Sequence, residues 1–439
     1  MTIAAIGLCV ALVGRAANYT IINSFPANSG PICALVQDHE GTFYGTTQRG
    51  GDYGYGSVFR LSNSGVFTNL VSFKYSDGAY PYAGLLQASD GALYGTAQNG
   101  STNDYGSVFR VTTNGRMTTL VAFTFTNGAY PKGTLLEGDD GAFYGTTYGG
   151  GSNGVGTVFR VTTNGELRTL VSFAVTNGAH PFAGLTLGGD SALYGTTLQG
   201  GTDPTNFIFD YGSVFRITTK GEFTALAMFN GYGVAHPSGG LLLGNDGLLY
   251  GTTEGTVFSI TTNGILNTIA SFAFNDDSGI DPNATLIQYF DGAFYGTASQ
   301  GGEAGYGAGT VFRVTTNGLL SPMVQFNFSG GAQPMGGLLR GLDGALYGTT
   351  CQGGLYGGGT VFRVDITSSI FLYPLVQGTN GFTIAFNGLP GDSYQVLRAT
   401  NLSGPWVTIT NAAAGQFGGG HCGDPSPPSG NAFYQLAFP

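Results

Sequence analysis

The chain has 439 residues, of which only 9% are charged, 13% are aromatic and 78 are glycine. This composition excludes a mainly helical protein, because glycine weakens helices and the charged residues that favour them are scarce. The formal net charge of −10, with no basic tract in the chain, excludes a nucleic-acid partner.

The first 16 residues have the pattern of an export signal. Ile3–Gly14 is apolar over the length of a signal core, and Gly14 and Ala16 supply the small residues of a cleavage site. A buried first strand is the alternative. No later segment reaches the roughly 18 apolar residues that a membrane-spanning helix needs. We therefore expect an exported protein, secreted or held at a bacterial cell surface, without a membrane span.

A unit of about 50 residues is then repeated, with the length of a propeller blade. Residues 131–173 show it most clearly, as four short apolar strands separated by Asp140-Gly141, a glycine-rich loop and Asn164-Gly165. Four strands per unit are typical of a β-propeller. The string Tyr-Gly-Thr marks seven units, 45 to 56 residues apart, beginning at Tyr44, Tyr94, Tyr144, Tyr194, Tyr250, Tyr295 and Tyr347.

The two ends of the repeat predict that the array closes into a ring. The last unit has three strands, ending at Val361–Val364, and no fourth strand follows. Tyr19–Phe25 matches the fourth-strand pattern and precedes the first copy of strand one, Pro31–Val36. A blade assembled from both termini leaves no exposed sheet edge. We therefore predict an all-β fold, a seven-bladed β-propeller over residues 18–367.

The repeated strings resemble a known family. Asp-Gly-Ala-(Leu/Phe)-Tyr-Gly-Thr-Thr, then Gly-Gly, then Gly-Thr-Val-Phe-Arg-Val-Thr-Thr-Asn-Gly recur almost verbatim between residues 18 and 366. They are similar to the GloVer tandem repeat of exported bacterial proteins. This resemblance implies a repeat propeller from a surface or secreted protein, and it brings no established activity and no catalytic residues.

From about Phe371 the pattern changes to that of a second, smaller domain. Apolar and polar residues alternate in four short segments, which predicts a small C-terminal β-sandwich over residues 371–439. The segment resembles the fibronectin-III-like modules that end many secreted bacterial proteins. Trp406, the single tryptophan of the chain, is expected in the core of this domain.

Residues that recur in every blade are expected to be structural, including an aspartate at one turn (Glu40 in the first unit) and an arginine in strand three. Functional candidates vary within the fixed frame. One variable position directly precedes the proline that opens strand one, near the central channel. It suits binding of polar ligands, with free variation of loop ends as the alternative. Around the ring it holds Gly30, Tyr80, Tyr130, His180, His236, Asp281 and Gln333.

The fourth and fifth units make this loop face asymmetric. Residues 198–211 form the longest loop between strands two and three, and this loop contains Phe207 and Phe209. The fifth unit has almost no such loop and carries Glu254 there. We expect the apolar loop to fold over the gap and wall a pocket. The predicted ligand-binding residues are Tyr80, Tyr130, His180, His236, Asp281, Gln333, Phe207, Phe209 and Glu254.

Two chemical roles stay open for His180, His236 and Asp281, which come from three successive blades. Two imidazoles and a carboxylate can ligate a divalent metal ion. The same groups can act as catalytic acid and base in polysaccharide cleavage, because histidine has a pKa near neutrality. The sequence contains no nucleophile motif, phosphate-binding loop or Cys-x-x-Cys, and no other cofactor is expected.

Two cysteines are expected to meet where the ring closes. Cys33 opens strand one of the first blade, and Cys351 follows strand two of the seventh. A disulfide between them is compatible with export, and two separate buried thiols are the alternative. Cys422 has no evident partner.

The sequence favours a non-catalytic secreted or cell-surface protein that binds a glycan or another extracellular polymer through its loop face. A secreted polysaccharide lyase or hydrolase, with its site at the top of blades 4–6, is the alternative. A structural component of the envelope or matrix is the third interpretation.

Overall fold

The computed structural model describes most of the repeat region and parts of the chain after it. The predicted export signal, residues 1–16, lies outside the described residues. The chain divides into two compact units, of which the larger comprises residues 18–288 and 294–364 and the smaller includes residues 365–439. The described residues are 19–201, 211–231, 234–272, 277–289, 291–302, 307–366, 371–372, 376–378, 381–387, 393–400, 405, 407–413, 419–424 and 433–437.

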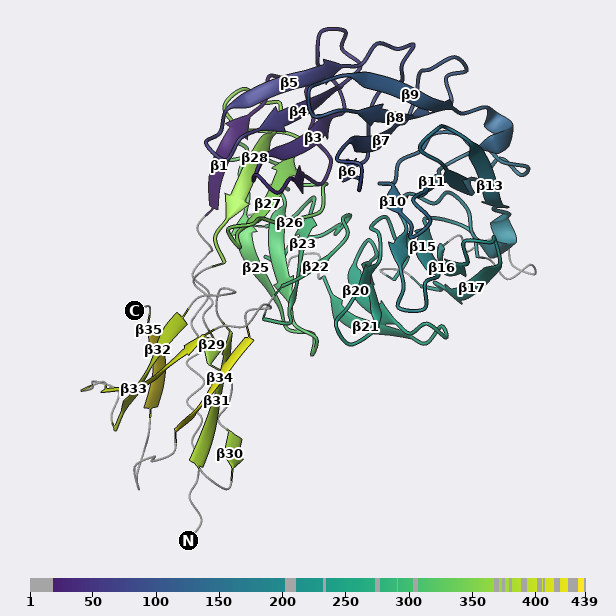
Figure 1. Ribbon diagram of the computed structural model, residues 1–439. Coiled ribbons are helices and arrows are strands. Elements are labelled where there is room, and N and C mark those ends of the chain that lie inside the picture. The colour runs from purple at the N-terminus through teal and green to yellow at the C-terminus, as the bar shows by residue number, and fades with distance from the viewer. Residues whose placement is uncertain are drawn as a thin grey trace. The chain divides into compact units, whose positions relative to one another are not determined.

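The larger unit is an all-β propeller of seven four-stranded antiparallel sheets around a central axis (Figure 1). In each sheet, or blade, the short first strand lies nearest the axis and the fourth lies at the outside (Figure 1). Seven blades of four strands are therefore confirmed. Within the described part of the chain, no helix has the length and apolarity that a membrane span requires.

Six blades are built from consecutive strands. Blade 1 has β2 (Val36–Gln37), β3 (Phe43–Thr47), β4 (Ser57–Leu61) and β5 (Phe67–Ser72). Blade 2 has β6 (Leu86–Gln87), β7 (Leu93–Ala97), β8 (Ser107–Val111) and β9 (Met117–Ala122). Blade 3 has β10 (Leu136–Glu137), β11 (Phe143–Thr147), β12 (Thr157–Val161) and β13 (Leu167–Ser172). A short 3-10 helix precedes blade 3, η1 (Phe125–Asn127), and another precedes blade 4, η2 (Val175–Asn177).

The second half of the ring continues the pattern. Blade 4 has β14 (Thr186–Leu187), β15 (Leu193–Thr197), β16 (Ser213–Ile217) and β17 (Phe223–Met228). Blade 5 has β18 (Leu242–Leu243), β19 (Leu249–Thr252), β20 (Thr256–Ile260) and β21 (Leu266–Ser271). Blade 6 has β22 (Ile287–Gln288), β23 (Phe294–Ala298), β24 (Thr310–Val314) and β25 (Leu320–Gln325). Blade 7 has β26 (Leu339–Arg340), β27 (Leu346–Thr350), β28 (Thr360–Val364) and β1 (Tyr19–Ser24).

Blade 7 closes the ring with strands from both ends of the repeat region, as predicted. β1 runs antiparallel to β28, with Thr20 paired to Arg363 (Figure 1). The Phe25 N–H donates to the Gly359 carbonyl at 2.9 Å. The Phe25 ring is only 1% exposed and lies 5.1 Å from the ring of Phe59 in blade 1. The closing segment therefore joins blade 7 to blade 1 through both backbone hydrogen bonds and core packing.

The Tyr-Gly-Thr signature is explained by packing between the second and third strands. In blade 3, Gly145 pairs with Phe159, whose ring lies over the glycine. A Cβ on Gly145 would lie 2.6 Å from Phe159 Cζ and 2.9 Å from Leu135 Cδ2. The equivalent phenylalanine and leucine crowd the glycine in every blade. Glycine is needed at this position because the aromatic core passes directly over the backbone.

We expect Gly145→Ala to lower the free energy of unfolding by about 1–3 kcal/mol, because Phe159 and Leu135 are buried and the added methyl group overpacks them. Gly189 is the matched control, since its Cβ would meet nothing within 4 Å. Gly189→Ala should change the free energy of unfolding by less than about 0.5 kcal/mol. Urea unfolding measures both variants, and equal effects would contradict this account of the signature.

The recurring aspartate and arginine form structural ion pairs in at least four blades, as expected. In blade 3, Asp140 Oδ2 lies 2.7 Å from Arg160 Nη2 and accepts a hydrogen bond from Tyr144 Oη at 3.1 Å. In blade 1, Asp38 supplies the carboxylate to the tyrosine, whereas Glu40, at the predicted position, is exposed. The equivalent triads are Asp90–Tyr94–Arg110, Asp190–Tyr194–Arg216 and Asp343–Tyr347–Arg363.

These triads predict a loss of stability in acid. Burial alone would raise the pKa of Asp140, but hydrogen bonds from Arg160, the Ala142 N–H and Tyr144 outweigh it, so the pKa is lowered. The pKa values of Asp90, Asp190 and Asp343 are lowered in the same way. A lowered carboxyl pKa stabilises the fold above the unfolded value of about 3.9, and this contribution disappears as the pH falls through the folded value.

The free energy of unfolding should therefore decrease below about pH 4. Replacing all four aspartates by asparagine should flatten this decrease, which urea titrations between about pH 2 and pH 7 can measure. If the variant and the wild-type protein lose stability in parallel over this range, the triads are not its source.

The smaller unit contributes two antiparallel sheets, one of order β29–β31–β30 with β34 also paired to β31, and one of order β33–β32–β35. A fibronectin-III-like sandwich stays a prediction, and Trp406 lies outside the described residues. The strands are β29 (Phe371–Leu372), β30 (Val376–Gly378), β31 (Gly381–Asn387), β32 (Ser393–Ala399), β33 (Val407–Ala413), β34 (Gly419–Asp424) and β35 (Phe433–Ala437).

Candidate functional site

The segment before strand one and the loop after strand two lie side by side on one face of the propeller, as expected. In blade 3, Ala129 pairs with Gly149, and the Tyr148 N–H donates to the Tyr130 carbonyl at 3.2 Å. The Tyr130 N–H donates to the carbonyl of Tyr105, in blade 2, at 2.9 Å. The residue before the proline therefore ties its own blade to the preceding blade through its two backbone groups.

This joint has a left-handed backbone in all seven blades, with φ between 54° and 57°. Such a conformation costs a residue other than glycine on the order of 1–2 kcal/mol. The backbone at this position is thus fixed while the side chain varies. At Gly30 no side chain fills the space, and a hollow of about 520 Å³ lies beside Gln48, Arg49 and Phe328. The other six positions are Tyr80, Tyr130, His180, His236, Asp281 and Gln333.

A cavity of about 340 Å³ lies on the propeller axis, where the seven first strands begin. We call it the channel-mouth site. The second and third residues after each of the seven prolines are mostly glycine and alanine, which leaves space at the axis. The residues directly after the seven prolines, two positions beyond Gly30 and its equivalents, all line the cavity. They are Ile32, Tyr82, Lys132, Phe182, Ser238, Asn283 and Met335.

Aromatic side chains form one wall of the channel-mouth site. The rings of Tyr82 and Phe182 meet edge to face, with 5.3 Å between their centroids. Tyr148, directly after β11, is not part of the cavity lining, but its ring lies 6.3 Å from that of Phe182. Lys132 Nζ lies among them, 4.1 Å from the ring centroid of Tyr148, 4.7 Å from that of Phe182 and 5.6 Å from that of Tyr82. These separations are within the range of cation–π interactions.

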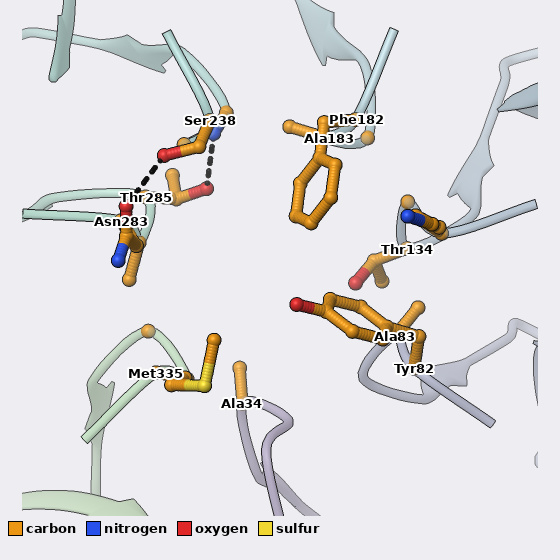
Figure 2. Close-up of a pocket in the computed structure, with 18 of the residues that line it drawn as sticks. Ala34, Tyr82, Ala83, Thr134, Phe182, Ala183, Ser238, Asn283, Thr285 and Met335 are labelled. Atoms are coloured by element: carbon orange, nitrogen blue, oxygen red, sulfur yellow. Dashed lines mark hydrogen bonds between the residues drawn. The ribbon is translucent and has the colours of Figure 1, made fainter. Parts of the chain in front are cut away.

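Blades 5 and 6 present hydrogen-bonding groups across the cavity from these rings (Figure 2). Ser238 Oγ donates to Asn283 Oδ1 at 2.9 Å. Asn283 Nδ2 in turn donates to Ser299 Oγ at 3.0 Å. Met335 and Ala34 lie between the polar and the aromatic side chains (Figure 2). The site therefore has an aromatic wall and a polar wall that face each other.

An acidic group adjoins the polar wall. Glu254 and His236 both line the cavity, and His236 Nδ1 lies 3.1 Å from Glu254 Oε1. In blade 6, burial raises the pKa of Asp281, and the charge of Glu254 raises it further, against a hydrogen bond from Gln300. The tight turn at residues 253–255 places Glu254 here, and it corresponds to the shortened loop of the fifth unit.

His180 lies behind the aromatic wall. Its ring stacks on Tyr148 at 4.6 Å, and its Nδ1 is 2.9 Å from the Tyr148 carbonyl oxygen. The structure thus places His180 with Tyr148 and His236 with Glu254. Among the residues that the structure describes, no three histidine, cysteine, aspartate or glutamate side chains form a group that could hold a metal ion. The predicted metal-ligand set, with Asp281 as its carboxylate, is therefore not assembled.

The remaining predicted residues lie away from the cavity wall or outside the described residues. The rings of Tyr80 and Tyr130 pack between blades, 6.0 and 5.9 Å from a tyrosine of the preceding blade. Gln333 accepts a hydrogen bond from the thiol of Cys351. Phe207 and Phe209 fall outside the described residues, so their role as a pocket wall stays a prediction.

Cys33 and Cys351 are free thiols, and the predicted disulfide between them does not form. The buried Cys33 Sγ donates to the Thr46 carbonyl at 3.3 Å and accepts from the Thr46 N–H at 3.1 Å. Cys351 Sγ is directed to Gln333 Oε1, at 3.5 Å. Both cysteines do lie at the seam, where Thr349 Oγ1 donates to the Cys33 carbonyl at 2.7 Å. Their sulfur atoms are nevertheless engaged with different partners.

Sequence reasoning missed five central side chains of the site, although a signal for them was present. The residue after each proline varies as widely as the residue before it. The side chains before the proline at Tyr80, Tyr130 and His180 contact the preceding blade, whereas the residue directly after each proline lines the cavity. The missed residues are Tyr82, Lys132, Phe182, Ser238 and Asn283.

Solved structures share the propeller fold at low sequence identity. Two structures of the extracellular domain of BT4673 from B. thetaiotaomicron, described as a hybrid two-component system and a one-component system, are each 12% identical and have TM-scores of 0.53 and 0.52. They match 85% and 90% of this chain and 45% and 48% of their own length. The extracellular domain of BT3049 from the same organism is 11% identical, with a TM-score of 0.51, over 95% of this chain and 53% of its own length.

The chain thus spans about half the length of these structures, and at this identity the likeness shows the fold alone. No curated protein matches the sequence significantly. The model of the Gloeobacter/Verrucomicrobia repeat matches residues 30–255 and 209–404, which together cover most of the chain. The resemblance of the Tyr-Gly-Thr units is therefore confirmed, and the protein belongs to the Gloeobacter/Verrucomicrobia repeat family.

Proposed function

We propose that this protein is an exported, non-catalytic binding protein that holds the end of a glycan chain in its channel-mouth site. The observation that carries the proposal is the pair of facing walls, with Tyr82 and Phe182 on one side and Ser238 and Asn283 on the other (Figure 2). A sugar has an apolar face and a rim of hydroxyl groups. Aromatic rings with a few fixed polar groups are the usual lining of a site for such a ligand.

The size of the cavity limits what it can hold. Its volume of about 340 Å³ lies at the lower end of the range for small-molecule sites, which is roughly 300–1,000 Å³. The site therefore suits one end of a polymer. Burial raises the pKa of Tyr82, so its hydroxyl group stays protonated and can donate a hydrogen bond to the ligand. The hydroxyl group points into the cavity (Figure 2).

Export rests on two supporting observations. The first 16 residues have the pattern of an export signal. The propellers of similar fold are extracellular domains of B. thetaiotaomicron proteins. A glycan at the cell surface or in the surrounding medium is the partner that this location would supply.

A polysaccharide lyase or hydrolase is the second candidate, favoured by the group of His236, Glu254 and Asp281. Two of these residues line the cavity, and burial together with Glu254 raises the pKa of Asp281. A carboxyl group of raised pKa beside an ionised one is the pairing that glycoside hydrolysis uses. In this structure Glu254 Oε1 lies close to His236 Nδ1, and this contact favours a structural role for Glu254 over a catalytic one.

A glycan array followed by product analysis separates the candidates. We expect the full chain to bind a restricted set of glycans and to release no product from them. Glycan cleavage that is lost in Glu254→Gln would establish the enzyme instead. If neither binding nor cleavage is found across the array, the binding proposal is wrong and a structural role in the envelope or matrix stands in its place.

A further inference from the structure

We propose that the channel-mouth site selects glycans whose terminal sugar carries a carboxylate, and that Lys132 is the residue that recognises this group. The inference rests on the proposed function and adds the chemical class of the ligand. Uronic acids are the common sugars of this class, since a carboxylate replaces the terminal hydroxymethyl group of the neutral sugar.

The position of Lys132 is fixed by the rings around it. Tyr82, Tyr148 and Phe182 approach the ammonium group from blades 2, 3 and 4, with the closest ring centroid at 4.1 Å. His180 also stacks on Tyr148, which helps to hold that ring in place. A lysine side chain normally moves freely in solvent, whereas this one is half-buried and confined. Confinement before the ligand arrives reduces the entropy lost on binding.

The ammonium group has aromatic partners but no acidic one. Among the described residues, no carboxylate lies within ion-pair distance of Lys132. Burial lowers the pKa of Lys132, because the rings displace water without supplying an opposite charge. A ligand carboxylate would supply that charge through a charge-assisted hydrogen bond. The cavity thus presents a fixed cation in a protein whose formal net charge is −10.

The opposite wall determines which way the ligand faces. Glu254 lines the cavity beside His236, and its charge acts on Asp281. A carboxylate placed there would be repelled, whereas the hydroxyl groups of a sugar can bond to Ser238 and Asn283. The ligand is therefore expected to direct its carboxylate to blade 3 and its hydroxyl groups to blades 5 and 6.

Matched pairs of oligosaccharides test the inference. Each acidic glycan that the array provides is compared with its carboxyl-reduced, neutral derivative by calorimetric titration at low ionic strength. The wild-type protein should bind the acidic member about tenfold to a hundredfold more tightly. Lys132→Met should remove this preference and still bind the neutral member. Lys74→Met is the control, since Lys74 Nζ also lies over a ring, that of Tyr53, at 5.6 Å, but on an exposed loop away from the cavity.

Lys132→Arg separates charge from packing, because it keeps the positive charge and changes the shape of the side chain. It should retain most of the preference for acidic glycans. Equal binding of acidic and neutral members by the wild-type protein would overturn the inference and leave the proposed function standing. A preference that persists in Lys132→Met, or that Lys132→Arg and Lys132→Met lose equally, would also overturn it. Absence of binding to both members of every pair would instead refute the proposed function.

Discussion

Phe25→Ala is expected to lower the free energy of unfolding by about 3–5 kcal/mol, the largest effect of any single substitution considered. Phe25 ends the segment that closes the propeller, and its phenyl group is buried between blade 7 and blade 1. Removal of the phenyl group leaves a cavity beside Phe59 and weakens the attachment of β1. Once β1 detaches, the edge of β28 is exposed and the ring can open.

Phe67→Ala is the matched control for this prediction. Phe67 packs against the same rings, 5.5 Å from Phe25 and 5.7 Å from Phe59, but it is 38% exposed and lies on β5, outside the closing segment. Its removal should lower the free energy of unfolding by about 1–2 kcal/mol. Urea unfolding curves compare the two variants. If Phe67→Ala proves as destabilising as Phe25→Ala, closure by the N-terminal strand is not what holds the ring.

The double variant Tyr82→Ala/Phe182→Ala is expected to weaken glycan binding about 100-fold, which corresponds to about 2.7 kcal/mol. The two rings, from blades 2 and 4, meet edge to face and form the aromatic wall of the cavity. Both side chains are half-buried and neither belongs to a blade core, so the variant should fold normally. Calorimetric titration with the best ligand from the array measures the loss.

The double variant Tyr80→Ala/Tyr130→Ala serves as the control. Tyr80 lies two residues before Tyr82, and Tyr130 lies two residues before Lys132. The rings of Tyr80 and Tyr130 pack between blades and do not line the cavity. Their removal should change the affinity less than about threefold, although it should lower stability. A larger loss of affinity in this variant than in Tyr82→Ala/Phe182→Ala would move the site from the channel mouth to the residues before the prolines.

The architecture could be predicted from the sequence because each blade repeats the same local pattern. The Tyr-Gly-Thr strings set the number of blades, and the strand pattern of Tyr19–Phe25 supplied the missing fourth strand. Alternation and turn residues act over a few positions, so a sequence displays them directly. The acid of blade 1 was misplaced because Asp38 reaches the same tyrosine from two residues upstream, which depends on the path of the turn.

The site was predicted only in part, since it depends on how different blades meet. Variation around the prolines pointed to the face on which the channel-mouth cavity lies, and the predicted residues included His236 and Glu254, which line it. The residue types do not reveal the left-handed backbone before each proline, and of the seven residues at that position only His236 lines the cavity. The aromatic rings around Lys132 come from three different blades. Cys33 and Cys351 both lie where blade 7 meets blade 1, but their thiols contact different partners.

A crystal structure of the full chain with its best-binding glycan tests the central claim most directly. The account predicts the terminal sugar in the channel-mouth cavity, with its apolar face on Phe182 and Tyr82 and its hydroxyl groups within hydrogen-bond distance of Ser238 and Asn283. A glycan bound elsewhere, on the outer rim of the blades or on the smaller unit, with the channel mouth empty, would contradict it.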